Sequence, residues 1–242
     1  MHRSGIIEYY QFFKEGEQLS DEDVLEGLMS VNTRNALPNE KFEYRNSGYA
    51  LLAQIVEKIS GKEFEDYMAD EIFKPIGMKN TSLYIDGKEI LNRAYGYTIK
   101  EDGSIEKTDQ SQGTAVKGDG CIYSSLEDFY YWDQALYTDK LVPQEILENA
   151  FYGYDKDGKT DKKGYGYGWE INYDANNNKL VEHTGASLGF TNHYVRVPSQ
   201  NISVVLFTNR FHPFYKNTRF TNMAYKLLNH FSDGKINAPV EE

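Results

Sequence analysis

The sequence predicts an α+β fold, in which an antiparallel sheet is covered by a C-terminal helix and accompanied by a helical region. Apolar residues recur at helical spacing before about residue 163, whereas strand-like runs joined by short polar turns follow Gly164. Short connections favour antiparallel pairing over an alternating βαβ order. We therefore expect residues 1–242 to form a single domain, mainly helical over about 1–163, with the sheet and covering helix over about 164–235.

Helix signals come first along the chain. The segment Ser20-Asp21-Glu22-Asp23 is typical of a capping box and predicts the start of a short helix. The best-defined helix is expected over residues 47–60, because apolar residues lie at helical spacing and Gly61 can form a left-handed cap. A third helix, over about 64–72, is expected to stop before Pro75, which disfavours helical backbone in the preceding residue.

Turn and strand signals follow. Asp102-Gly103 predicts the turn of a surface β-hairpin over residues 97–108, and Ser125 is expected to cap a further helix. A helix is expected from about Asn217 to Phe231, after four strands over residues 165–173, 179–183, 190–197 and 202–208. A sheet of about four strands is small for a chain of 242 residues.

Composition limits the classes of function. The 37 acidic and 26 basic residues give a net charge of −11, which repels phosphate backbones, so we expect no nucleic-acid partner. No run reaches the roughly 18 apolar residues of a transmembrane helix, so we expect no membrane span. We expect packing, not nucleophilic chemistry, from the single Cys121. We expect no cofactor, and no metal site, because metal-ligand spacing is lacking at His183, His193, His212 and His230.

Two motifs point to a site. Tyr44-Arg45-Asn46 precedes the predicted 47–60 helix, so Tyr44 and Asn46 could face one cavity. A tyrosine has a pKa near 10, so Tyr44 could act as a base near neutrality only beside cations. The alternative is that Tyr44 packs at the surface and Asn46 caps the helix. Far downstream, His183-Thr184-Gly185 is expected where a short strand ends in a turn of small residues, which could bring backbone N–H groups to a substrate oxygen.

Together with His2-Arg3-Ser4-Gly5, residues 118–125 and Tyr167-Gly168-Trp169, these motifs resemble, in order, the landmarks of the β-lactamase and penicillin-binding serine hydrolase family. The resemblance covers nearly the whole chain. It implies a β-lactamase/transpeptidase-like fold and an acyl-enzyme reaction, in which Ser-x-x-Lys, Tyr-x-Asn and Lys/His-Thr/Ser-Gly motifs converge between an α domain and an α/β domain. It also implies an extracytoplasmic location, but no secretory signal is visible after Met1, so the compartment stays open.

The resemblance implies roles for individual residues. Tyr44 would move protons, Asn46 would bind the substrate amide, and His183 stands where many members carry lysine. An imidazole with the usual pKa of about 6.5 is mostly neutral at pH 7, so recognition of an anionic substrate carboxylate is expected to be weak. The histidine form resembles D-alanyl-D-alanine carboxypeptidases and esterase-like members of the family.

The residues after His183 complete the implied site. Thr184 would line it beside Gly185, and the backbone N–H of Ala186 would be one donor to the oxyanion. The expected substrate is a D-amino-acid peptide, an ester or another acylated small molecule. β-Lactam hydrolysis is expected to be inefficient.

The nucleophile required by the resemblance is not found before Tyr44. Two Ser-x-x-Lys strings occur, at residues 104–107 in the predicted hairpin and 232–235 in the polar tail. Both look accidental, because the reaction needs Ser and Lys one turn apart on a buried helix. His2-Arg3-Ser4-Gly5 resembles the segment that follows the nucleophile helix. We therefore expect that Met1 falls inside the full domain, that this N-terminally incomplete chain is inactive or nearly so, and that its sheet either exposes an edge or takes a pairing partner.

Two alternatives from other classes of function stay open. Residues 185–189 satisfy the G-x-S-x-G string of the α/β-hydrolase nucleophile elbow, which would make Ser187 the nucleophile of an esterase. An elbow needs a following helix and a downstream triad, for which His212 or His230 with Asp233 would have to serve. The other alternative is a non-catalytic module whose cleft binds peptides or cell-wall ligands.

Overall fold

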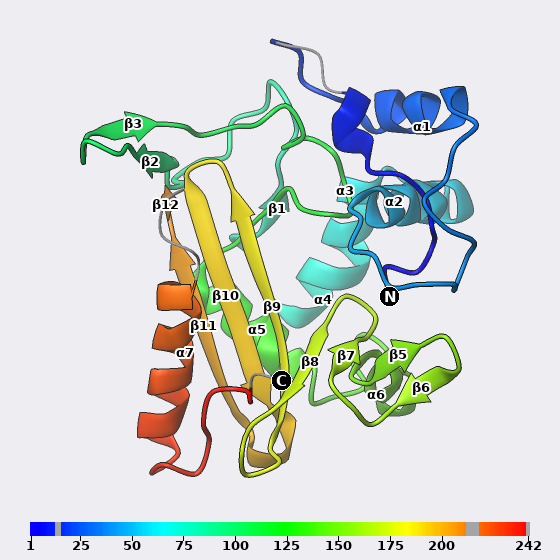
Figure 1. Cartoon of the computed structure of the whole chain (residues 1–242). Helices are drawn as coiled ribbons and strands as arrows, with labels where there is room; N and C mark the ends of the chain where they lie inside the picture. The colour runs from blue at the N-terminus through cyan, green and yellow to red at the C-terminus, as the bar shows by residue number, and fades with distance from the viewer. Residues whose placement is uncertain (13–15, 212–217, 241–242) are drawn as a thin grey trace. The chain divides into compact units, whose positions relative to one another are not determined.

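The computed structural model describes residues 1–12, 16–211 and 218–240, and its helices and antiparallel sheets confirm the predicted α+β class (Figure 1). The chain forms two compact units, each assembled from separate segments. Unit 1 contains Ala94–Gln110 and Glu145–Glu242 together with Met1, and unit 2 contains His2–Arg93 and Ser111–Gln144. The organisation as a single domain divided near residue 163 stays a prediction.

Unit 2 is mainly helical. Its helical elements are a 3₁₀ turn (Tyr9–Phe12), α1 (Asp21–Ser30), α2 (Ser47–Ser60), α3 (Phe64–Tyr67), a π-helical segment (Met68–Phe73), α4 (Lys74–Ile76) and α5 (Leu126–Ala135). Strands β1 (Ser82–Leu83) and β4 (Ile122–Tyr123) pair antiparallel. One apolar cluster joins the 3₁₀ turn, α1 and α2 around the fully buried Val24 and Val116, and another joins α4, β1 and α5.

The helix ends in unit 2 follow local signals with one exception. At the start of α1, the Asp23 N–H donates to Ser20 Oγ (3.1 Å) and the Ser20 N–H donates to Asp23 Oδ2 (2.8 Å), which confirms the capping box. Helix α2 has the predicted bounds, and Gly61 caps it in the left-handed region with φ 70°. The predicted stop before Pro75 is wrong, because Pro75 lies in the first turn of α4, where a missing N–H costs no hydrogen bond.

Unit 1 is built around a five-stranded antiparallel sheet of order β11-β10-β9-β8-β7. Its strands are β7 (Gly164–Tyr165), β8 (Glu170–Tyr173), β9 (Lys179–Ser187), β10 (Phe190–Val197) and β11 (Ile202–Thr208). Smaller sheets join β12 (Arg210–Phe211) to β2 (Tyr97–Ile99) and β3 (Ile105–Lys107), and β5 (Gly153–Asp155) to β6 (Gly158–Thr160). The remaining elements are α6 (Gln144–Ala150), a 3₁₀ turn (Pro198–Gln200) and α7 (Thr218–Phe231).

Helices cover both faces of the five-stranded sheet. Ala224 and Leu228 of α7 pack on Leu180 and Val195, and Figure 1 shows α7 alongside the long strands. On the opposite face, the end of α6 packs on β8 and β9. Because side chains alternate along a strand, β9 is buried from both sides near its start and carries polar residues toward its end. The predicted covering helix is confirmed from Thr218 onward, and the predicted start at Asn217 lies outside the described residues.

Two predicted strands have different bounds. The prediction of one strand over residues 165–173 is wrong, because the chain turns between β7 and β8, where the Gly166 N–H donates to the Trp169 carbonyl (2.7 Å). The strand predicted to end at His183 continues to Ser187, so His183-Thr184-Gly185 lies within β9 and not in a turn. The hairpin over 97–108, the helix capped by Ser125, β10 and β11 are confirmed.

None of the helices formed by residues 1–12, 16–211 and 218–240 combines the length and the apolar character needed to cross a membrane.

Candidate active site

In unit 2, the Tyr-x-Asn motif lies at the N-terminus of α2. Asn46 occupies the N-cap position, yet its side chain makes no capping hydrogen bond. Its Nδ2 donates instead to Tyr10 Oη at 2.6 Å. Glu8 takes over the capping role, because its carboxylate accepts from the backbone N–H groups of Asn46 (2.9 Å) and Ser47 (3.3 Å). The Asn46 carboxamide is therefore not used to cap the helix.

Tyr44 lies just before this helix terminus and is 43% exposed. Its ring stacks on the buried His2 ring, with a centroid separation of 3.8 Å and an interplanar angle of 34°. The Arg45 backbone N–H donates to His2 Nδ1 at 3.1 Å, and the Glu43 N–H donates to the His2 carbonyl at 2.8 Å. The landmark that begins at His2 thus holds the Tyr-x-Asn segment in place.

Tyr9 links the start of α2 to the side chain of Asp119. The Tyr9 backbone N–H donates to Ser47 Oγ (2.8 Å), and the Tyr9 hydroxyl donates to Asp119 Oδ2 (2.8 Å). Burial raises the pKa of Asp119 to about 7. Burial also raises the pKa of the Cys121 thiol to about 12, so Cys121 stays protonated at neutral pH and packs in an apolar cluster.

In unit 1, His183 lies within β9 and uses both ring nitrogens. Nδ1 lies 2.6 Å from the Thr184 carbonyl oxygen, and Nε2 lies 2.8 Å from Tyr165 Oη. Tyr165 is 5% exposed and comes from β7, two strands away in the sheet. This pair fixes the orientation of the His183 ring.

The register of β9 and β10 determines where the backbone groups after His183 point. Ser187 and Phe190 close a two-residue turn and form a hydrogen-bonded pair, so the adjacent pair Ala186 and Thr191 is a non-hydrogen-bonded one. The Ala186 N–H therefore points away from β10. The pairing of β8 with β9 ends at Glu182, so none of the described strands covers β9 on that side. Ala186 thus presents its N–H at an open strand edge.

Gly185 and Thr184 have distinct places on this edge. A Cβ atom on Gly185 would come within 2.7 Å of the Asn192 side-chain amide, so the close approach of Asn192 requires glycine. Alternation along β9 places the Thr184 side chain on the face opposite that of His183. On the Thr184 face, Glu182 Oε2 accepts from Tyr225 Oη (2.7 Å) and lies 2.8 Å from His193 Nε2. The Thr184 backbone, in contrast, lies on the open edge beside Ala186.

The serines proposed as alternative nucleophiles lie in unsuitable places. Ser187 is followed by strand β10 and not by a helix, so the nucleophile-elbow hypothesis is wrong. One of its possible triad partners, His212, lies outside the described residues. Ser104 and Lys107 lie on the β2–β3 hairpin, and Ser232 and Lys235 follow the end of α7. Neither Ser-x-x-Lys string therefore lies within a helix.

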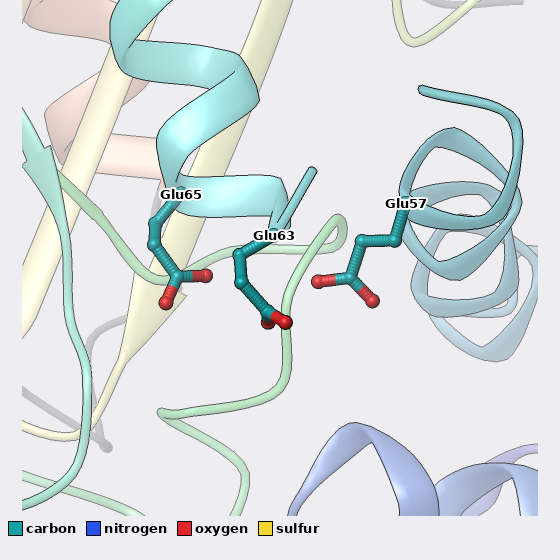
Figure 2. Close-up of side chains that lie close together, drawn as sticks. All are labelled: Glu57, Glu63 and Glu65. Atoms are coloured by element: carbon teal, nitrogen blue, oxygen red, sulfur yellow. The ribbon is translucent and has the colours of Figure 1, made fainter. Parts of the chain in front are cut away.

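A cluster of carboxylates lies at the other end of α2, where Glu57, Glu63 and Glu65 converge within 4.8 Å (Figure 2). The Lys117 ammonium group sits against this cluster, 2.8 Å from Glu57 Oε1 and 3.0 Å from Glu65 Oε2. Glu57, Glu63 and Lys117 line a cavity of about 690 Å³ that none of the predicted site residues lines. Because the Lys117 ammonium group already pairs with these carboxylates, we assign the cluster a structural role.

Comparison with known proteins identifies the family. A family model described as Beta-lactamase matches residues 1–228. The chain belongs to the Beta-lactamase family. Penicillin-binding protein 4* of Bacillus subtilis (strain 168) is 28% identical over 251 residues, which cover 97% of this chain and 54% of the relative. This Beta-lactamase-family chain therefore spans about half of that relative's length.

Solved structures agree with this assignment. The octameric penicillin-binding protein homologue from Pyrococcus abyssi has a TM-score of 0.77 at 25% identity, over 96% of this chain and 54% of that one. The D-amino acid amidase from Ochrobactrum anthropi SV3, in complex with D-phenylalanine, has a TM-score of 0.76 at 19% identity, over 95% and 70%. The predicted β-lactamase/transpeptidase-like fold is confirmed.

Three side chains next to the predicted site residues of this Beta-lactamase-family chain were missed by sequence reasoning. Glu8 and Tyr10 both contact Asn46, and Tyr165 contacts His183. The only signal was their proximity to the landmarks, since Tyr165 precedes Tyr167-Gly168-Trp169. With 20 tyrosines in the chain, residue type alone could not single out two of them.

Proposed function

We propose that this chain supplies the proton-transfer and substrate-binding groups of a serine acyl hydrolase of the Beta-lactamase type. In this proposal Tyr44 moves protons and Asn46 binds the substrate amide. The geometry in unit 2 supports these roles, because Glu8 caps α2 in place of Asn46 and the half-exposed Tyr44 is braced by His2. A preorganised amide and phenol stabilise a transition state without reorganisation at the moment of reaction.

The second group of residues lies on β9, and one observation there carries the proposal. The Ala186 N–H points out of an open strand edge, where a backbone donor can stabilise the oxyanion of a tetrahedral intermediate. His183 and Thr184 flank this edge, and Gly185 allows Asn192 to approach it. We propose that these residues of unit 1 serve an acyl-transfer reaction.

The proposed substrates are D-amino-acid peptides, amides and esters. Relatives of this chain include a D-aminopeptidase of Gluconobacter oxydans (strain 621H), and the D-amino acid amidase shares its fold. We also propose that a strand from a partner pairs with β11, which lies at one end of the five-stranded sheet formed by the described residues.

We propose further that residues 1–242 alone do not form an acyl-enzyme, because their Ser-x-x-Lys strings lie on a hairpin and past a helix end. The purified chain should be exposed to a fluorophosphonate probe and, in parallel, to a fluorescent penicillin. Intact mass and peptide mapping then report any adduct. We expect no adduct on the chain, whose folding is checked by circular dichroism. A known serine hydrolase, used as the control, should be labelled fully.

A stoichiometric adduct on one serine would overturn this proposal and identify the nucleophile. The non-catalytic alternative makes a different prediction, because a binding module keeps its affinity for D-amino-acid peptides whether or not an acyl-enzyme can form. Absence of labelling together with absence of any peptide binding would count against both the hydrolase site and the binding module.

A further inference from the structure

The proton position on His183 follows from its two neighbours. A carbonyl oxygen can only accept a hydrogen bond, so the 2.6 Å contact with the Thr184 carbonyl requires a proton on Nδ1. In the neutral ring Nε2 then carries a lone pair, which accepts the hydroxyl proton of Tyr165 at 2.8 Å. Both ring nitrogens are thus engaged by groups of unit 1.

The sheet holds this arrangement in place. Tyr165 is buried, and its ring meets the His183 ring edge-on, with centroids 5.8 Å apart. Tyr165 pairs with Glu170 across β7 and β8, and Glu170 pairs with Glu182, the residue before His183, across β8 and β9. The hydroxyl therefore belongs to a buried side chain of the same sheet, not to a flexible side chain at the surface.

Charged groups of both signs act on Glu170 of the neighbouring strand. Burial raises its pKa and Glu182 adds to this, whereas His183, His193 and Lys163 act in the opposite direction. A carboxylate beside an imidazole favours a protonated ring. The hydrogen bond that the Tyr165 hydroxyl donates to Nε2 favours the neutral ring instead, because a protonated Nε2 cannot accept it.

We infer that Tyr165 is a positioning residue that holds His183 as a neutral imidazole with its proton on Nδ1. The site then offers no ring N–H or cation to a substrate carboxylate at this point. It therefore takes acyl donors with an uncharged leaving group, a D-aminoacyl amide or ester, in preference to peptides that end in a free carboxylate. The substrate preference rests on the proposed function, whereas the tautomer does not.

The first test is the proton position in the wild-type chain, which needs no substitution. Residues 1–242 are labelled with ¹⁵N-histidine, and long-range ¹H–¹⁵N spectra are recorded at pH 7. The chain contains five histidines, and a His183→Gln variant assigns the signals of His183. We expect Nδ1 to resonate as a protonated nitrogen and Nε2 as an imine nitrogen. Three results would overturn the inference: a proton on Nε2, protons on both nitrogens, or a proton that exchanges between the two nitrogens.

A pair of variants tests the role of Tyr165. In Tyr165→Phe the Nε2 signal should move toward that of an imine nitrogen without a hydrogen-bond donor, while the proton stays on Nδ1. The matched control is Tyr154→Phe, because the Tyr154 hydroxyl donates to the Asn149 carbonyl (3.1 Å) and not to His183. An unchanged Nε2 signal in folded Tyr165→Phe would overturn the assignment of Tyr165.

The substrate preference is tested with two probes, N-acetyl-D-alanyl-D-alanine and its C-terminal amide. Titrations of the full chain should show the amide binding about tenfold more tightly than the acid. His183→Lys, which introduces a cation, should remove or reverse that difference. Equal or tighter binding of the acid by the wild type would overturn the preference. Failure of both probes to bind would overturn the proposed function and its substrate class, while the spectra would still decide the tautomer.

Discussion

At the scale of single residues, two different side chains contact the Tyr-x-Asn segment, one to cap the helix and one to hold the Asn46 amide. An asparagine at an N-cap usually accepts from the first helical N–H groups. Here the Glu8 carboxylate accepts from the N–H groups of Asn46 and Ser47, and the Asn46 amide is held by Tyr10. The helix terminus is satisfied by one side chain, so another can be oriented for binding.

Asp119 yields a prediction at the same scale. Its pKa is about 7 in the folded chain, owing first to burial, against about 3.9 when unfolded. The folded state therefore binds the proton more tightly, and stability falls as pH rises from about 4 to about 7. Asp119→Asn, which keeps an acceptor for Tyr9, should raise the free energy of unfolding at pH 8 by about 2 kcal/mol.

Urea unfolding at pH 8 and pH 4 measures the Asp119 effect. The advantage of Asp119→Asn over the wild type should shrink as the pH falls, because the wild-type carboxyl is then protonated in both states. The control is Asp157→Asn, at an exposed carboxylate, which should change stability little at either pH. An advantage of equal size at both pH values would contradict the argument.

At the scale of elements, Lys117 joins helices that are distant in sequence. Its ammonium group lies 3.6 Å from Asp21 of α1, 2.8 Å from Glu57 of α2 and 3.0 Å from Glu65 of α3. Burial opposes the charge, but hydrogen bonds to Glu57 and Glu65 outweigh it and raise the pKa of Lys117. One cation therefore bridges carboxylates that three helices bring together.

Lys117→Met should leave these carboxylates to repel one another and should lower the free energy of unfolding by about 2 kcal/mol. Chemical denaturation at pH 7 measures this loss. Lys62→Met is the matched control, because Lys62 pairs with Asp70 and Glu71 in an exposed position, where an ion pair contributes little. Equal losses in the two variants would show that Lys117 is an ordinary surface cation.

The elements that were predicted correctly have local signals. Helix α2 has both an apolar period and a glycine cap, and β10 has alternating residues between turns. The end of β9 was missed because Thr184-Gly185-Ala186 has little intrinsic strand preference and becomes a strand only through its register with β10. The helix through Pro75 was missed because a proline in a first turn is compatible with helix.

The residues of the candidate site also fall into those that the sequence indicates and those that it does not. Tyr44, Asn46 and His183 belong to short motifs and were found in the sequence. Their partners were not found, because Tyr10 is 36 residues from Asn46 and Tyr165 is 18 residues from His183. Contacts of that separation depend on the tertiary fold and leave no periodic trace in the sequence.

At the scale of the whole molecule, the chain interleaves its two units. The segment Ala94–Gln110 belongs to unit 1, although it is flanked by unit 2 on both sides. Within unit 1, its strand β2 pairs in parallel with β12, and Asn209 Nδ2 donates to the Tyr95 carbonyl at 2.8 Å. The Gly96 N–H donates to Asp109 at 2.7 Å, which closes the hairpin on itself.

This interleaving predicts how fragments behave. Residues 145–242 alone lack β2 and β3, so β12 loses its strand partner and the turn at Gly189 loses the hydrogen bond that the Tyr97 N–H donates to its carbonyl (3.3 Å). A fragment in which residues 94–110 are joined to 145–242 by a flexible linker restores both contacts, and closing such a loop costs little entropy. In urea followed by circular dichroism, we expect the linked fragment to unfold cooperatively at a higher midpoint than residues 145–242. Equal midpoints would mean that the hairpin is an appendage of unit 1 and contributes nothing to its stability.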